Sequence, residues 1–592
     1  MRFPSIAALA GKTREVLLRF PWVLAAGGVA AFAALYTVHG PNQDFWARLM
    51  MVAALGLPLL TALTLFAEQR RWTGVRKTVL LATGVLLLAG FYQVWNGPQE
   101  EYQVIRYFQL SISLHLLVAF LPFVGIFQRD AFWQYNRRLF EALLRAVLFS
   151  GVLFLGLVIA LAALDKLFGV EVPGETYPRL WVVMAFVVNT WIFLGDVPED
   201  LPSLSAESDY PRPLKVLSQY ILTPLVAIYL VLLTAYLVKI GMTGDWPSGW
   251  IGYLVASVAV VGLLAFLLVA PLRDREGEGW IRTFSRCLFF GLIPAAVMFL
   301  LALWKRIDPY GLTEMRVLGF LLGVWLLGIA LWFTIRRNAG IHIIPVSLAI
   351  LLLVTLYGPT SATNLSIGSQ ARRIRSLLAP RADSAQVSTT AQVEVSSALR
   401  FLLSHQARGA IQEALGDKVP GLADLPEVTN MNRDSIAGAI LDSLDLDYTP
   451  TYEVAGHFSF SPGEGGPLEI RGYDYAFPLS RDTMPVIIEG DTLSIRLDSL
   501  ASRLRVLRRG EPVLEFDLGR VIDSLKTPDE QSLAPARRLL AVAEGKGMRG
   551  LLRITWINGR RTDSGIRVSD VTGEMLVGYL PPGRAVTGPG TP

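Results

Sequence analysis

Apolar residues are distributed very unevenly along this chain. Between residues 20 and 361, stretches of about 20 mostly apolar positions alternate with short polar segments, and no such stretch follows residue 361. A helix of that length, rising ~1.5 Å per residue, crosses a hydrocarbon core ~30 Å thick. Because a backbone in lipid must satisfy its own hydrogen bonds, each stretch predicts a transmembrane helix. The eleven predicted spans are 20–38, 49–67, 78–95, 107–127, 143–164, 180–195, 216–238, 251–271, 284–304, 317–335 and 343–361.

The chain beyond the last span predicts a water-soluble domain that begins with helices. SIGSQARRIRSLL continues with helical periodicity and SAQVSTT has the composition of a linker, so residues 362–390 are predicted to be an exit helix and linker. Amphipathic patterns then predict helices near 391–404, 408–416 and 433–444.

After Tyr448, alternation of apolar and polar positions predicts strands. TYEVAGHFSF and LEIRGYDYAF flank SPGEGGP and predict a hairpin, and Asn558-Gly559 predicts the turn of another. TLSIRLDSL and SRLRVLRRGEPVLEFDL are also strand-like, and a helix is predicted near 535–544. The predicted fold class is an α-helical polytopic membrane domain of about 11 transmembrane helices, followed by a soluble α+β domain with a mostly antiparallel sheet.

Composition indicates the class of protein, and the distribution of charge predicts the orientation of the chain in the membrane. Of the 592 residues, 52% are hydrophobic and only 17% are charged, which is too apolar for an ordinary soluble enzyme. Lys and Arg are concentrated in the segments on the N-terminal side of the alternating spans, so the N-terminus is predicted to be cytoplasmic and, after an odd number of spans, the C-terminal domain extracytoplasmic. The predicted domains are a cytoplasmic segment 1–19, a transmembrane domain 20–361, the exit helix and linker 362–390, and an extracytoplasmic α+β domain 391–592.

The residues that usually signal metal, redox or nucleotide chemistry are sparse. Cys287 is the single cysteine, so no internal disulfide can form, and the five histidines form no HExxH motif or close pair. A Walker A loop is also missing from the sequence. We therefore predict no metal and no cofactor.

The most informative polar segment is KRIDPYGLTEMR, residues 305–316, between two predicted spans. Proline and glycine favour a turn at Pro309-Tyr310-Gly311, Thr313 is a candidate cap for the next helix, and Glu314 suits its first turn. The basic residues of the segment remain as excess positive charge on the predicted outer side, where lysine and arginine commonly hold phosphate or carboxylate. Together with one arginine of another outer loop, the candidate anion or lipid contacts are Lys305, Arg306, Arg316 and Arg106.

A second group of residues forms a candidate polar cluster on the same predicted side. Two of its carboxyls, Asp308 and Glu314, would serve as acid and base if desolvation separated their pKa values. The alternative is an ordinary charged loop between spans, with no chemistry of its own. The candidate cluster comprises His115, Asp165, Lys166, Asp308, Tyr310 and Glu314.

Several longer stretches carry a resemblance to a known family. They are FWQYNRRLF (132–140), LDKLFGV (164–170), NTWIFL (189–194), the segment 214–240, YGLTEMR (310–316) and the segment 344–374. In these stretches the chain resembles a bacterial multi-pass family known as domain of unknown function 4153 (DUF4153). The resemblance implies a multi-pass protein of the bacterial cytoplasmic (inner) membrane and implies no particular reaction.

Three functional hypotheses remain open at this point. The preferred one is a non-enzymatic envelope protein whose membrane domain anchors an extracytoplasmic binding module. The alternatives are a membrane enzyme or carrier acting on lipid-linked or anionic substrates at the outer surface, and a transporter. The expected partners are the lipid bilayer and either a lipid headgroup or an envelope protein, and no nucleic acid is expected.

Overall fold

The chain forms two compact units. The computed structural model describes residues 6–37, 42–206, 210–244, 250–273, 278–336, 339–379, 389–416, 419, 428–429, 432–444, 446, 457–460, 470–479, 485–488, 490–498, 502–523, 539–562 and 565–579. The first unit contains residues 1–373 and 404–413, and the second contains residues 374–403 and 414–592. The chain therefore leaves the first unit, returns to it for ten residues and leaves it again.

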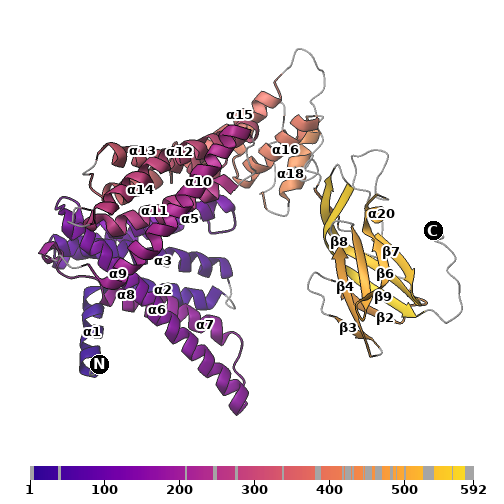
Figure 1. The fold of residues 1–592 in the computed structure, drawn as a ribbon, viewed down its shortest axis with the longest axis horizontal. Coiled ribbons are helices and arrows are strands. Elements are labelled where there is room, and N and C mark those ends of the chain that lie inside the picture. The colour runs from indigo at the N-terminus through magenta and orange to yellow at the C-terminus, as the bar shows by residue number, and fades with distance from the viewer. Residues whose placement is uncertain are drawn as a thin grey trace. The chain divides into compact units, whose positions relative to one another are not determined.

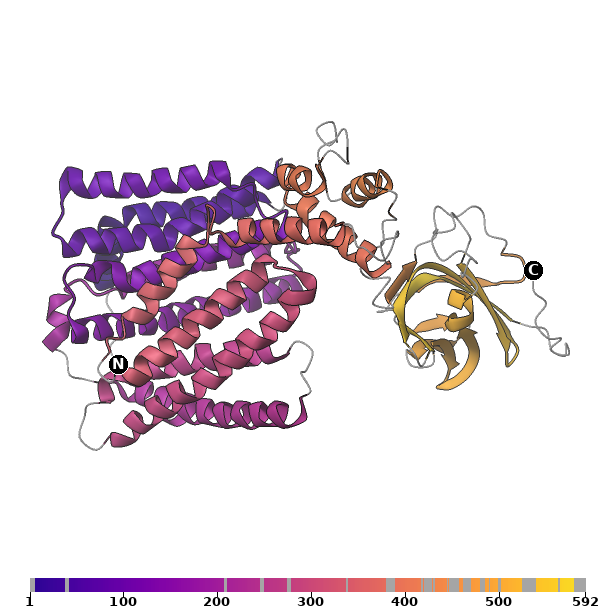
Figure 2. The ribbon, with the colours of Figure 1, turned by 90° about the horizontal axis from the view of Figure 1, so that it is seen from above.

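The first unit is a bundle of long apolar helices (Figures 1 and 2). Within the described residues, nine helices are long and apolar enough to cross a membrane, and a tenth span forms if the bent pair α1–α2 is counted. The helices of this unit are α1 (Ile6–Arg19), α2 (Pro21–Thr37), α3 (Gln43–Gln69), α4 (Gly74–Val94), α5 (Glu101–Phe120), α6 (Arg129–Phe168), α7 (Thr176–Val183), α8 (Asn189–Gly195), α9 (Arg212–Lys215), α10 (Thr223–Thr243), α11 (Trp250–Val269), α12 (Gly279–Tyr310), α13 (Glu314–Ile335), α14 (Ile343–Val354) and α15 (Ala362–Leu377).

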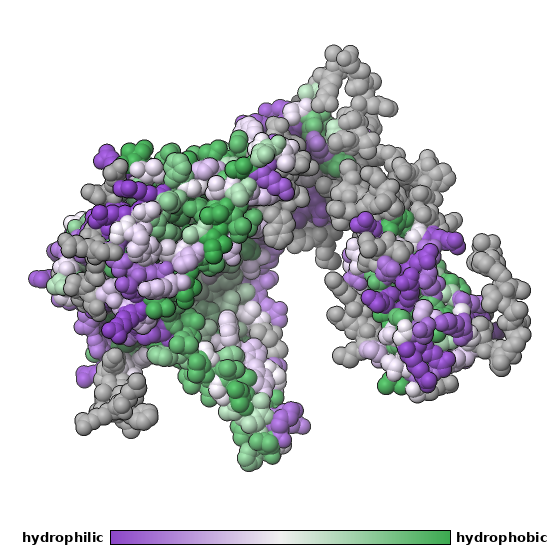
Figure 3. All heavy atoms as spheres, in the orientation of Figure 1, coloured by the Kyte–Doolittle hydropathy of each residue, from purple (hydrophilic) through white to green (hydrophobic). Residues whose placement is uncertain are grey.

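The sides of this bundle are covered with apolar side chains. Leu148, Val152 and Ile159 on α6 are each 60–62% exposed, and Figure 3 shows hydrophobic residues along α6. In water such a surface would be unfavourable, whereas in a bilayer lipid tails cover it. The protein is therefore a multi-pass membrane protein, and we call the first unit the membrane unit.

The last predicted span, 343–361, differs from the helix that forms there. Helix α14 has 12 residues, or about 18 Å of rise, and ends at Val354. Gly358 adopts a φ of +84°, and the following Pro359 has no N–H group and disfavours helix in the residue before it. The helix resumes as α15 after a seven-residue break, residues 355–361.

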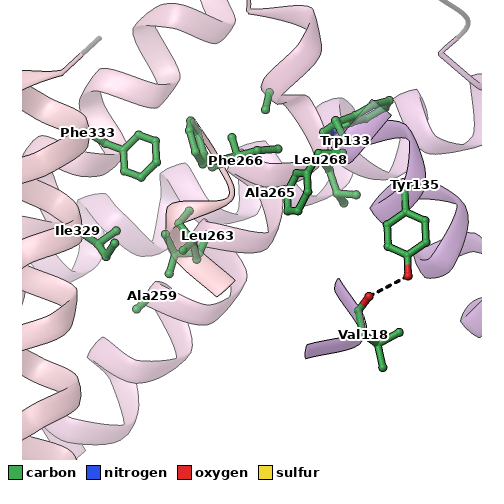
Figure 4. Packing of buried hydrophobic residues seen from close by; sticks show 14 of the residues in the cluster. Val118, Trp133, Tyr135, Ala259, Leu263, Ala265, Phe266, Leu268, Ile329 and Phe333 are labelled. Carbon is green, nitrogen blue, oxygen red and sulfur yellow. Dashed lines mark hydrogen bonds between the residues drawn. The ribbon is translucent and has the colours of Figure 1, made fainter. Parts of the chain in front are cut away.

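The stretch FWQYNRRLF forms a buried hub on α6 (Figure 4). The Tyr135 hydroxyl donates to the Val118 carbonyl at 2.8 Å, and the Trp133 indole donates to the Leu267 carbonyl at 2.8 Å. Buried phenol and indole groups need such partners. The hub thereby connects α6 with α5 and α11.

The second unit contains short helices and two antiparallel sheets. The helices are α16 (Thr389–Ser404, whose last residue belongs to the membrane unit), α17 (Arg408–Leu415, largely in the membrane unit) and α18 (Arg433–Asp442). The first sheet has the order β1-β8-β9-β2, with β7 also paired to β8, and the second has the order β3-β4-β5-β6. The remaining elements are β1 (His457–Phe460), β2 (Tyr475–Leu479), β3 (Val486–Ile488), β4 (Asp491–Asp498), β5 (Arg503–Arg508), β6 (Glu511–Asp517), α20 (Leu518–Asp523), β7 (Leu539–Gly545), β8 (Met548–Thr562) and β9 (Gly565–Tyr579).

One hydrophobic core joins the two sheets, and we call β1–β9 with α20 the β module. Phe516 of β6, Leu552 of β8 and Val577 of β9 are all fully buried in this core. Its side chains come from both sheets and from α20. The strands predicted in TLSIRLDSL and SRLRVLRRGEPVLEFDL are confirmed as β4, β5 and β6, and the helices predicted near 391–404 and 408–416 are confirmed as α16 and α17.

Three predictions for the β module were wrong. Strands β1 and β2 form no hairpin with each other, because β8 and β9 lie between them; SPGEGGP itself lies outside the described residues. Asn558 and Gly559 lie inside β8, where they pair with both β1 and β9, and β8 continues to Thr562. A helix was predicted near 535–544; residues 535–538 lie outside the described residues, and those from 539 onward form strand β7 with alternating burial.

The β module should fold by itself, and its core gives the first prediction. A fragment of residues 447–592 should unfold cooperatively, and Phe516→Ala should lower its free energy of unfolding by about 3–5 kcal/mol because it leaves a cavity between the sheets. Ile487→Ala is the matched control, because the Ile487 side chain is 74% exposed. Urea denaturation measures both; equal losses in the two variants would contradict the core assignment.

Asp491 gives a prediction about pH. Its buried carboxylate accepts hydrogen bonds from Arg508 and Arg509, and the Arg508 guanidinium beside it, assisted by Arg509, holds the pKa of Asp491 below its usual value. Because this pKa is lower in the folded than in the unfolded state, the resulting stability is present above the unfolded pKa of about 3.9 and is lost as pH falls through the folded pKa.

We therefore expect Asp491→Asn to flatten the decrease in the free energy of unfolding between about pH 5 and pH 2. The control is Glu511→Gln, which changes a carboxylate that is 77% exposed. Unfolding curves of the fragment at a series of pH values measure the slope. An unchanged slope in Asp491→Asn would contradict the assignment.

Candidate functional site

A buried glutamate–histidine pair lies at the start of α13. Glu314 is in the first turn of this helix, and its Oε1 lies 2.6 Å from Nε2 of His405. Each of the two side chains is only 6% exposed. Both residues belong to the membrane unit, because His405 lies in the returning segment 404–413. A carboxylate without this partner would be costly at such a buried position.

Two further groups orient the imidazole of His405. The ring of Tyr102 on α5 stacks on it with centroids 4.5 Å apart, and the Ser404 hydroxyl lies 3.0 Å from Nδ1. With Glu314 ionised, Nε2 carries the proton and donates it in the hydrogen bond. The imidazole is therefore held from both of its nitrogens and on one face.

Arg106 lies one turn further along α5 than Tyr102. Its guanidinium carbon is 5.2 Å from the centre of the Tyr102 ring and 5.1 Å from that of Tyr357, which follows α14. Aromatic faces attract a guanidinium within about 6 Å. We call Glu314, His405, Tyr102, Arg106 and Tyr357 the candidate site.

The connection between α12 and α13 is fixed by α15. The Leu312 amide donates to the Ser369 hydroxyl at 3.1 Å, and the Gln370 side chain donates to the Leu312 carbonyl at 2.9 Å. Gly311 has a φ of +68°, and an added Cβ would lie 2.9 Å from the Gln370 amide nitrogen. A glycine is thus required here, and it places Glu314 at the helix start.

The predicted turn in KRIDPYGLTEMR was wrong in its position. Helix α12 continues through Pro309 and Tyr310, and the connection is Gly311–Thr313. Thr313 is the N-cap residue of α13 but makes no side-chain cap hydrogen bond. The side chains of Asp308 and Tyr310 lie outside the described residues, so the proposed pairing of the Asp308 and Glu314 carboxyls stays a prediction.

The other sequence-predicted residues have separate surroundings. Lys305 and Arg306 are exposed near the end of α12, and Arg316 donates to the Gly311 carbonyl at 2.8 Å. His115 is exposed on α5 and donates from Nδ1 to the Ser111 carbonyl of its own helix. Asp165 and Lys166 form a pair with each other, 2.9 Å apart, near the end of α6.

Of the predicted residues, the structure thus brings Glu314 and Arg106 together, through His405 and Tyr102. Sequence reasoning missed His405, Tyr102 and Tyr357. No spacing signal links His405 to Glu314, because 91 residues separate them. The only available signal was indirect, since a glutamate at the end of an apolar helix needs a partner when it is buried. Within the described residues, no group of three metal-ligating side chains occurs.

Comparison with known proteins places the chain in a family. Residues 24–385, more than half of the chain, match the model of a family described as a domain of unknown function, DUF4153. The chain belongs to the DUF4153 family. The resemblance seen in the sequence is therefore confirmed, and in this DUF4153 protein the matched region contains Arg106 and Glu314 but ends before His405.

One curated relative can be compared with this DUF4153 chain. The uncharacterized protein PM1469 of Pasteurella multocida (strain Pm70) is 23% identical over 272 residues, which are 45% of this chain and 44% of that protein. The match therefore spans less than half of the relative's length. No solved structure matches this chain.

The Glu314–His405 pair gives a prediction about stability. His405→Ala should destabilise the membrane unit by about 3–5 kcal/mol, because it leaves the Glu314 carboxylate buried without its partner. Glu314→Ala should cost about 1–3 kcal/mol, because the imidazole it leaves can be neutral. The double variant should lose less than the sum of the two single losses, since it removes both groups.

Unfolding of the detergent-solubilised protein measures these three variants. His115→Ala is the matched control, because His115 is an exposed histidine of the same unit and should change stability by less than about 0.5 kcal/mol. Strictly additive losses would show that Glu314 and His405 do not interact.

Proposed function

We propose that this protein is an envelope protein of the bacterial cytoplasmic membrane, whose membrane unit anchors an extracytoplasmic binding module. The observation that carries the proposal is the return of residues 404–413 to the membrane unit, where His405 is buried against Glu314. The chain segment that leads to the β module is thereby held at two points, at α15 and at His405. Such a double attachment suits an anchor.

The construction of the β module supports binding rather than catalysis. Its interior is filled by apolar side chains from both sheets, so ligands are expected on its surface. Strands β2 and β3 end their sheets, and Ile487 on β3 is 74% exposed. An edge strand with an exposed apolar residue is a surface to which an extended segment of a partner protein can add.

A second candidate function, transport, is favoured by the break between α14 and α15. Discontinuous helices supply backbone groups for substrates in many transporters. Here Gln109 of α5 donates to the Thr355 hydroxyl at 3.0 Å beside the break, and both residues are buried. Uptake of labelled solutes into vesicles containing the purified protein, abolished by Gln109→Leu, would favour transport over anchoring.

The proposed orientation can be tested by cysteine labelling. In a Cys287→Ser background, Arg71→Cys, Gln99→Cys and Lys546→Cys each introduce one exposed thiol. A membrane-impermeant maleimide applied to intact spheroplasts should label positions 99 and 546 but reach position 71 only after permeabilisation. Positions 71 and 99 follow α3 and α4, so they lie at opposite ends of α4.

Each deviation from this pattern has a distinct meaning. Labelling of position 71 alone would show that the whole protein has the opposite orientation in the membrane. Labelling of position 99 without position 546 would place the β module in the cytoplasm and contradict the proposed function.

A further inference from the structure

Arg106 differs from several other arginines of the membrane unit in what its guanidinium contacts. Arg19 donates to Glu68 and to two carbonyls, and Arg145 donates to Asp196 at 2.6 Å. Arg48 and Arg70 each donate to a backbone carbonyl. Arg106 instead contacts the rings of Tyr102 and Tyr357, and its Nε makes no hydrogen bond with the described residues.

This arrangement leaves strong donors without acceptors. The Nε of Arg106 is buried and makes no hydrogen bond. A guanidinium keeps its charge at every physiological pH, so it cannot relieve this situation by losing a proton. A buried donor without a partner is destabilising, and a group that accepts from it would restore the lost hydrogen bonds.

The two tyrosines hold the guanidinium in place before any ligand arrives. Tyr102 is fixed by its stacking on His405, which in turn is fixed by Glu314. Tyr357 comes from the break between α14 and α15. Restricting a long side chain in advance lowers the entropic cost of binding a ligand to it.

The position of Arg106 suggests which anion is available. It lies five residues after the start of α5, about 8 Å along the helix, and two tyrosines, Tyr102 and Tyr357, occur at the same end of the bundle. Such aromatic residues mark the level of lipid headgroups. The planar fork of a guanidinium fits two oxygens of a phosphate.

We propose that Arg106 anchors a binding site for a phosphate group, with the rings of Tyr102 and Tyr357 next to its guanidinium. The phosphate is either the phosphodiester of a membrane lipid headgroup or a soluble phosphate. Arg106 is one of the four basic residues that the sequence analysis named as candidate anion contacts. We choose it because Arg316 already donates to the Gly311 carbonyl and because Lys305 and Arg306 are exposed. The site does not depend on the β module binding a partner.

The test measures the thermal stability of the full chain, delipidated in a neutral detergent. Phosphatidylglycerol, phosphatidylcholine or inorganic phosphate is added at increasing concentration, and the shift in Tm gives an apparent Kd. Arg106→Gln should weaken phosphate-group binding by about tenfold or more, the effect of one lost charge-assisted hydrogen bond. Arg336→Gln is the matched control, because Arg336 also lies over one aromatic ring, Trp332, but is exposed.

The three ligands separate the sources of the phosphate. Stabilisation by lipids alone, lost in Arg106→Gln and kept in Arg336→Gln, identifies a lipid headgroup, and an equal effect of inorganic phosphate identifies a soluble anion. Identical responses of Arg106→Gln and the unchanged protein would overturn the proposal. If Arg106→Gln does not fold, Arg106→Lys replaces it: this variant keeps the charge but loses the planar fork, and it should again bind about tenfold more weakly. Unchanged binding by Arg106→Lys would likewise overturn the proposal.

Discussion

In hydrocarbon, every backbone N–H and C=O group must find its partner within the protein, and the membrane unit depends on this constraint throughout. It accounts for the long helices, and it also explains how the chain tolerates the break after α14. The carbonyl of Val354 accepts from the Thr360 hydroxyl at 2.9 Å, and that of Gly358 accepts from the Asn364 side chain at 2.8 Å. Side chains thus replace the partners that the interrupted helix cannot supply.

The same constraint governs charged groups, which are costly in the bundle unless they are paired. Two charged residues, Arg19 and Glu314, are paired with groups that are distant in the sequence. Arg19, at the 96° bend between α1 and α2, binds Glu68 and two carbonyls near residue 197. Glu314, in the first turn of α13, binds His405. Each pairing fixes a change of chain direction or a return of the chain to the bundle.

Sequence patterns predicted those features that depend on local residues. Ten of the predicted spans correspond to helices. They could be predicted because the thickness of the bilayer sets the length of an apolar stretch, and such a stretch is recognised from neighbouring residues alone. Strands β4 to β6 could be predicted as well, because the alternation of apolar and polar positions is a local signal. The turn between β5 and β6 is local too: it is formed by Arg509 and Gly510, and both residues have a positive φ.

What the sequence did not reveal depends on contacts between distant residues. Asn558-Gly559 has the composition of a tight turn, yet pairing with β1 on one side and β9 on the other keeps it within β8. The dipeptide Gly358-Pro359 is typical of a break in a helix. It lies at the end of a long apolar stretch, however, and that stretch led to the prediction of an uninterrupted span over 343–361. Part of the candidate site could be predicted, because Glu314 and Arg106 are charged residues near the ends of predicted spans. His405 and Tyr102, which connect them, lie in sequence patterns that give no indication of a site.

The choice of a glutamate–histidine pair at this point has a physical consequence. An apolar contact of the same size would hold residues 404–413 as firmly or more firmly, because burying two polar groups carries a desolvation cost. An apolar contact, however, tolerates sliding, whereas a 2.6 Å hydrogen bond between two buried side chains is satisfied in one arrangement only. The pair therefore fixes the register of the returning segment rather than adding much stability. Because Tyr102 contacts both His405 and Arg106, that register also fixes one wall of the guanidinium site. The attachment of the segment and the geometry around Arg106 are thus two results of a single side-chain arrangement.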